Sequence, residues 1–108
     1  MNVKNYFEVY YNGAMNFMTP KAYGYGYKDY GDFGIVYEKS KGEGLFNSPL
    51  YGVSFLYVNF LTNEVRKIDL CKPFSTQKEV DKYINSITME DVINADKYGE
   101  VKVIPRFG

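Results

Sequence analysis

Hydrophobic and polar positions follow a strand-like pattern through most of the chain, which predicts a protein rich in β-structure. The β-prone runs cover residues 6–11, 14–18, 33–37, 51–60 and 65–71. Asn12-Gly13 stands between the first two runs, and this pair favours a type I′ hairpin turn because its two central residues need positive φ. Pro20 follows the second run and would end a strand, since proline cannot donate to a ladder. We therefore expect a β-hairpin at the N-terminus.

The run 51–60 is the strongest strand candidate. Its apolar residues fall on both parities, with Tyr51, Val53, Phe55 and Tyr57 on one and Leu56, Val58 and Phe60 on the other. Residues of both parities are apolar in a strand that is covered on both faces, so we expect a central strand. A turn at 61–64 and an amphipathic run at 65–71 predict that the next strand pairs with it.

The C-terminal third carries helical signals. Thr76 and Glu79 have the spacing of a capping box, and the apolar positions Val80, Tyr83, Ile84 and Ile87 then recur at helical spacing. Thr88 can cap a second helix, because Glu90 and Asp91 would lie near its positive end. A last strand is expected over 100–104, before Pro105.

Strands followed by two helices and a strand predict an α+β fold. We expect an antiparallel β-sheet of about five to six strands, with two short helices in the C-terminal third packed on one face. The length of 108 residues suits a single compact domain over 1–108, and no repeat or linker divides it.

The segment 22–32 is unusual because four tyrosines alternate with glycines, Lys28 and two aspartates. It would form either a loop or an extended segment with Tyr23, Tyr25 and Tyr27 on one face. One interpretation is structural, since tyrosines pack across strands and cover backbone left bare by glycine. Another is a recognition surface, because tyrosine is enriched at interfaces. A third is base stacking. The candidate partner-binding residues are Tyr23, Tyr25, Tyr27, Lys28, Asp29 and Tyr30.

Candidate catalytic chemistry is sparse. The chain has no histidine, which excludes Ser-His-Asp and Cys-His pairs and nearly all zinc sites within it. Cys71 is the only cysteine, so we expect a buried structural thiol and a reducing compartment. The acidic pairs Glu90 with Asp91 and Asp29 with Asp32 are typical of a helix start and a turn. We predict no catalytic residue, no metal site, no cofactor and no enzymatic activity.

Charge is balanced, with 13 basic and 13 acidic residues. This argues against a general nucleic-acid binder, which needs several cations on one face. No stretch resembles a signal peptide or approaches the length of a membrane helix, so we expect no membrane association and a cytoplasmic location. Abundant Lys, Asn, Tyr and Ile have AT-rich codons, which indicates a low-GC bacterium or its mobile elements.

These observations favour a small non-enzymatic protein that binds a larger protein as an inhibitor or modulator. In length and composition the chain resembles the short single-domain proteins of phages and mobile elements, which include inhibitors of host defence such as anti-CRISPR proteins. The alternatives are a single-stranded nucleic-acid-binding accessory protein with an aromatic surface, a small enzyme that works without histidine, and a homodimer. In the homodimer an edge strand such as 101–104 would pair across a two-fold axis.

Overall fold

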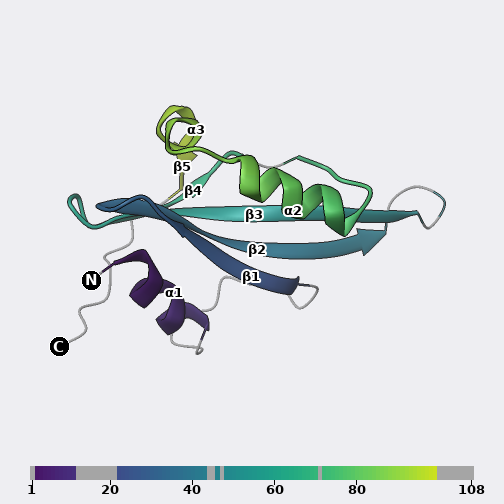
Figure 1. Cartoon of the computed structure of the whole chain (residues 1–108), viewed down its shortest axis with the longest axis horizontal. Coiled ribbons are helices and arrows are strands. Elements are labelled where there is room, and N and C mark those ends of the chain that lie inside the picture. Colours follow the sequence, from purple (N-terminus) through teal and green to yellow (C-terminus); the bar gives the residue numbers. More distant parts are fainter. Residues whose placement is uncertain (1, 12–21, 44–45, 47, 71, 100–108) are drawn as a thin grey trace.

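The structure is a computed structural model of the chain and describes residues 2–11, 22–43, 46, 48–70 and 72–99. Within these residues it contains one antiparallel sheet with strand order β1-β2-β3-β4-β5 and helices on both of its faces (Figure 1). This confirms the predicted α+β fold and antiparallel sheet. The elements along the chain are α1 (Val3–Tyr11), β1 (Ala22–Asp29), β2 (Phe33–Glu43), β3 (Pro49–Asn59), β4 (Glu64–Ile68), α2 (Gln77–Ser86), α3 (Met89–Asn94) and β5 (Lys97–Tyr98).

Strand β3 lies at the centre of the sheet, as the apolar residues on both of its parities predict. It pairs with β2 without interruption from Phe33 opposite Asn59 to Glu43 opposite Pro49. On its other side it pairs with β4. Consecutive strands are antiparallel neighbours throughout, although the connection from β4 to β5 is long and contains α2 and α3. Within the described residues β1 lies at one edge of the sheet.

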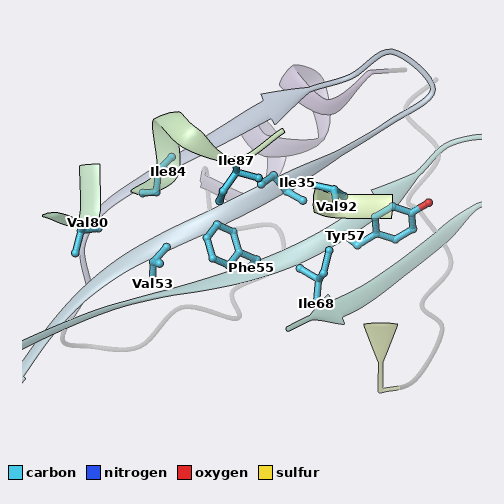
Figure 2. Packing of buried hydrophobic residues seen from close by; sticks show 9 residues of the cluster. All are labelled: Ile35, Val53, Phe55, Tyr57, Ile68, Val80, Ile84, Ile87 and Val92. Carbon is cyan, nitrogen blue, oxygen red and sulfur yellow. The ribbon is translucent and has the colours of Figure 1, made fainter. Parts of the chain in front are cut away.

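Helices α2 and α3 cover one face of the sheet, which we call the α2 face, at the positions that their capping signals predict. The Thr76 hydroxyl accepts a hydrogen bond from the Glu79 amide at 3.2 Å, and Thr88 forms a capping box with Asp91. Each cap satisfies amides that the first helical turn leaves free. The helices bury apolar side chains against those of the sheet, as Figure 2 shows for Val80, Ile84, Ile87 and Val92 against Ile35, Val53, Phe55, Tyr57 and Ile68.

Helix α1 covers the opposite face, which we call the α1 face (Figure 1). The predicted strand at 6–11 is therefore wrong. The Asn2 side chain accepts a hydrogen bond from the Asn5 amide at 2.9 Å, as an N-cap does. Val3 and Tyr6 are three residues apart on one side of the helix, and both are buried against a second cluster that includes Val36, Leu56, Val58 and Val65. Burial of this stripe outweighs the strand preference of tyrosine, phenylalanine and valine.

Three further predictions concern residues outside those that the structure describes. They are the Asn12-Gly13 turn with the strand at 14–18, the environment of Cys71, and the strand at 100–104.

Candidate functional site

The tyrosine-rich segment 22–32 is a strand over most of its length and not a loop. It forms β1, which pairs with β2 from Gly24 opposite Lys39 to Asp29 opposite Gly34. The register shifts between Ala22 and Gly24, so one residue is inserted into the ladder at Tyr23. An inserted residue of this kind bends the strand and can turn side chains away from the regular alternation.

The three alternating tyrosines do not share a face, so the expectation of one common face is wrong. Tyr27 packs on Phe7 of α1, with ring centroids 5.2 Å apart, and therefore lies on the α1 face. Tyr25 lies two residues away in the regular ladder and belongs to the same face. Tyr23 instead meets Tyr51 edge-on at 6.0 Å, next to the residues of the α2 face. The irregularity between Ala22 and Gly24 is the physical reason for this difference.

The glycines of β1 make room for side chains of β2 on the α2 face. A Cβ atom at Gly26 would overlap the Tyr37 ring and hydroxyl, and one at Gly24 would come within 2.8 Å of Lys39 Cε. Tyr37 and Lys39 therefore lie across the edge strand. The alternation from Gly24 to Tyr27 follows from this arrangement, because Tyr25 and Tyr27 occupy the α1 face and side chains of β2 cover the two glycines on the other.

Lys28, Asp29 and Tyr30 make contacts within the fold. Lys28 Nζ donates to the carbonyls of Ile84 at 2.7 Å and Ile87 at 2.8 Å, at the C-terminal end of α2. The Tyr30 hydroxyl donates to the same Ile87 carbonyl at 3.3 Å. Burial lowers the pKa of Lys28, and Asp91 opposes this effect. Asp29 Oδ1 accepts from the Gly31 amide at 2.8 Å and so supports the turn between β1 and β2.

Tyr23 belongs to a surface that sequence reasoning only partly found. We call Tyr23, Lys39, Lys41 and Tyr51 the tyrosine–lysine surface. The ammonium of Lys39 lies 5.7 Å from the Tyr23 ring centroid, and that of Lys41 lies 5.7 Å from the Tyr51 ring centroid. Both distances permit cation–π attraction. The residues that the sequence analysis missed are Lys39 and Lys41 on β2 and Tyr51 on β3. Lys39 and Lys41 follow Tyr37 at every second position, and this spacing could have placed them on one face of a strand.

Asp81 of α2 fixes one lysine of this surface. Its carboxylate lies 3.0 Å from Lys39 Nζ. Burial raises the pKa of the Tyr23 hydroxyl, Asp81 acts in the same direction, and Lys39 opposes both. The phenol of Tyr23 therefore stays protonated and available as a hydrogen-bond donor at neutral pH. Its side chain is 38% exposed.

A hollow of about 370 Å³ adjoins the tyrosine–lysine surface near the end of the β2–β3 hairpin. Its wall combines small residues with a few larger ones, namely Ser40, Lys41, Gly42, Leu50, Tyr51, Gly52 and Pro73. Leu50 is 45% exposed beside it, and Phe46 in the connection between the strands is 99% exposed.

A larger hollow, of about 520 Å³, lies between the segment after β4 and helices α2 and α3. It is lined by Asp69, Leu70, Lys72, Tyr83, Ser86, Asp91, Asn94 and Ala95. The Tyr83 hydroxyl donates to the Leu70 carbonyl at 2.6 Å. Asp91 accepts from the backbone and side chain of Thr88, and these hydrogen bonds lower the pKa of the Asp91 carboxyl. A carboxyl with a lowered pKa is a poor general acid at neutral pH.

Comparison with protein-family models, curated proteins and solved structures gave no significant match for this chain. Across the described ranges, acidic side chains nowhere gather in threes as a metal site requires. None of the helices in that part of the chain has the length and apolar character needed to cross a membrane.

Proposed function

We propose that the chain is a small non-enzymatic protein-binding module that docks on a larger protein through the tyrosine–lysine surface and inhibits or modulates it. The observation that carries the proposal is the pair of rings of Tyr23 and Tyr51, which are held edge-on at 6.0 Å while Tyr23 stays 38% exposed. Tyrosine buries a large area on binding and loses only two side-chain torsions, so such rings are effective anchors.

The rigidity of this surface supports the proposal. Lys39 is held by Asp81, and the backbone around Tyr51 is fixed by a pair of hydrogen bonds with Phe74, at 2.8 and 2.9 Å. Side chains that are ordered before binding lose less entropy when a partner arrives. The adjoining hollow and the exposed side chain of Leu50 extend the surface with apolar area.

The charge of the surface indicates what the partner presents. Lys39 has an acidic neighbour, whereas Lys41 has no ion pair among the residues that the structure describes and lies over the Tyr51 ring. A carboxylate on the partner would complement Lys41 at the rim of the apolar hollow. We therefore propose a protein partner with an apolar side chain for the hollow and an acidic residue beside it. The abundant Lys, Asn, Tyr and Ile have AT-rich codons, which supports a low-GC bacterial host, and host defence proteins are the class of partner that we propose.

Nucleic acid is the alternative, because tyrosines beside lysines also suit base stacking. The zero net charge and the Lys39–Asp81 ion pair weigh against it. Binding of single strands would weaken steeply with added salt, since neutralised phosphates release counterions. Binding to an apolar protein surface would weaken much less.

The test is a tagged pull-down from a low-GC bacterial lysate, with and without nuclease, read by mass spectrometry. The wild type is compared with Tyr23→Ala and with Tyr98→Ala, a control on β5 whose tyrosine is 52% exposed. We expect to recover a partner protein after nuclease treatment, to lose it with the Tyr23→Ala variant and to keep it with Tyr98→Ala. Equal recovery by both variants would refute the tyrosine–lysine surface as the docking site. Recovery that vanishes with nuclease would favour the nucleic-acid alternative.

A further inference from the structure

The larger hollow, between the segment after β4 and helices α2 and α3, has the size of a small-molecule site. Its volume is about 520 Å³. Sites for small ligands commonly occupy about 300–1,000 Å³ and combine apolar walls with a few polar groups that fix the orientation. Among the described residues none lines both this hollow and the one beside the tyrosine–lysine surface, so the docking function proposed above leaves the larger hollow unused.

One part of the wall holds an ammonium over an aromatic ring. Lys72 Nζ lies 5.2 Å from the Tyr83 ring centroid, within the range of cation–π attraction. The Tyr83 hydroxyl donates to the Leu70 carbonyl at 2.6 Å, and the ring packs on Phe74 with centroids 5.3 Å apart. The ring is therefore a fixed support for the ammonium. Both ion pairs of the described ranges join other residues, so Lys72 can still pair with an anion.

Another part of the wall carries a fixed carboxylate. The Thr88 amide donates to Asp91 Oδ2 at 2.9 Å and holds the side chain at the start of α3. Hydrogen bonds from Thr88 lower the pKa of the Asp91 carboxyl, and Lys28 and Lys72 act in the same direction, so this group is an anion at neutral pH. A carboxylate can accept about four hydrogen bonds, so Asp91 keeps capacity for a further donor in the hollow.

The rest of the wall includes apolar and neutral polar residues. Leu70 and Ala95 are half-buried and pack against the core of the α2 face. The Ser86 hydroxyl donates to the Tyr83 carbonyl at 2.7 Å, which leaves its oxygen as an acceptor. The hollow thus offers an apolar contact area together with one ammonium and a carboxylate, all from residues that line it.

The charges of the lining residues select the chemistry of the ligand. Asp69 and Asp91 are acidic, and among the described lining residues only Lys72 is basic. A phosphate or another multiply charged anion would meet two acidic residues and a single ammonium, which disfavours it. A plain amine would meet the like charge of Lys72. A ligand with both a carboxylate and an ammonium pairs with each charge, and charge-assisted hydrogen bonds are stronger than neutral ones.

We propose that this hollow binds a free α-amino acid with an apolar side chain. The carboxylate of the amino acid pairs with Lys72, its ammonium pairs with Asp91, and its side chain rests on Leu70 and Ala95. The four-carbon stem of Lys72 is flexible, so its ammonium can leave the Tyr83 ring and close on the ligand. The proposal is independent of the docking function, because no residue of the tyrosine–lysine surface lines this hollow.

Titration of the isotope-labelled full chain with L-leucine, followed by the amide chemical shifts in NMR spectra, tests the proposal. We expect saturable shifts at Ser86, Asn94 and Ala95 at ligand concentrations below about 20 mM. Leucinamide lacks the carboxylate, and N-acetylleucine lacks the ammonium. Each is expected to bind about fivefold more weakly than L-leucine, because charge pairs in an open hollow are partly screened by water.

Two variants remove the charges of the hollow one at a time. Lys72→Met keeps the stem and removes the ammonium. Asp91→Asn removes the negative charge and keeps an acceptor for the Thr88 amide. Each variant is expected to weaken the binding of L-leucine about fivefold.

Matched controls are Lys41→Met, which removes a similar ammonium over the Tyr51 ring, and Glu90→Gln, which removes a carboxylate of α3 outside the hollow. Both should bind L-leucine as the wild type does. Shifts that do not saturate by about 20 mM, or that lie away from the hollow, would overturn the proposal. So would equal binding of L-leucine and its two blocked forms. If Asp91→Asn fails to fold, the ligand series on the wild type decides.

Discussion

Replacing Lys28 with methionine is expected to destabilise the protein by about 1.5 kcal/mol. Methionine keeps an unbranched apolar stem of similar length, so the change mainly removes the ammonium. That ammonium donates to the carbonyls of Ile84 and Ile87 at 2.7 and 2.8 Å, where the end of α2 carries partial negative charge. If Lys28 served only a partner, the same substitution would leave the free energy of unfolding unchanged.

The magnitude follows from what each carbonyl retains. A hydrogen bond from a charged donor contributes about 1.5–3 kcal/mol, but partial solvent exposure reduces this. The Ile84 carbonyl keeps the Ile87 amide at 3.3 Å, and the Ile87 carbonyl keeps the Tyr30 hydroxyl at 3.3 Å. Neither oxygen is left without a donor, so the expected cost stays near the lower bound. Adding Tyr30→Phe removes the last of these donors to the Ile87 carbonyl, and the double variant should lose about 1 kcal/mol more than the sum of the single ones.

Urea unfolding followed by circular dichroism measures these differences at constant m-value. Tyr30→Phe alone is the graded control, with an expected loss of about 0.5 kcal/mol because its hydrogen bond is long and neutral. A change below about 0.5 kcal/mol for Lys28→Met, or strictly additive behaviour of the double variant, would refute the reasoning.

Two further predictions follow from close packing and from ionisation. Gly34→Ala should destabilise the protein by about 2–3 kcal/mol, because the new Cβ atom would overlap the Lys28 carbonyl oxygen and approach Val3 Cγ2 to 2.5 Å. Urea unfolding and the hydrogen-exchange rates of the α1 amides would show the loss. Gly42→Ala is the control and should be tolerated, because the nearest atom to its new Cβ is 3.9 Å away. Stability should also decline at alkaline pH, because burial raises the pKa of three phenols above 10.0, those of Tyr23, Tyr30 and Tyr37. Their contribution is complete below the unfolded value and is lost as pH rises through the raised folded value. The lowered pKa of Lys28 makes stability rise with pH below 10.5, so the net decline in stability is expected above pH 10.5. Urea unfolding midpoints measured from about pH 9 to about pH 12 would show this decline, with Tyr37→Phe as a less sensitive control.

The parts of the fold that were predictable have their signals close together in the sequence. The apolar residues on both parities of 51–60 indicate a central strand, and Thr76 and Thr88 mark two helix starts by spacing alone. Helix α1 was not predictable in this way. Its tyrosines, phenylalanine and valine prefer strands, and it is helical because Val3 and Tyr6 are buried against residues of β2, β3 and β4 far along the chain.

The candidate site was also predictable only in part. Composition marks the tyrosines of 22–32 as candidate binding residues, but their roles depend on the register of β1 with β2. That register covers Gly26 with Tyr37, and the irregularity before Gly24 places Tyr23 beside Tyr51. Lys28 looked like a contact residue because it lies among tyrosines, although its ammonium binds the end of a helix more than fifty residues away. No local pattern encodes these pairings, since strand register is a non-local property.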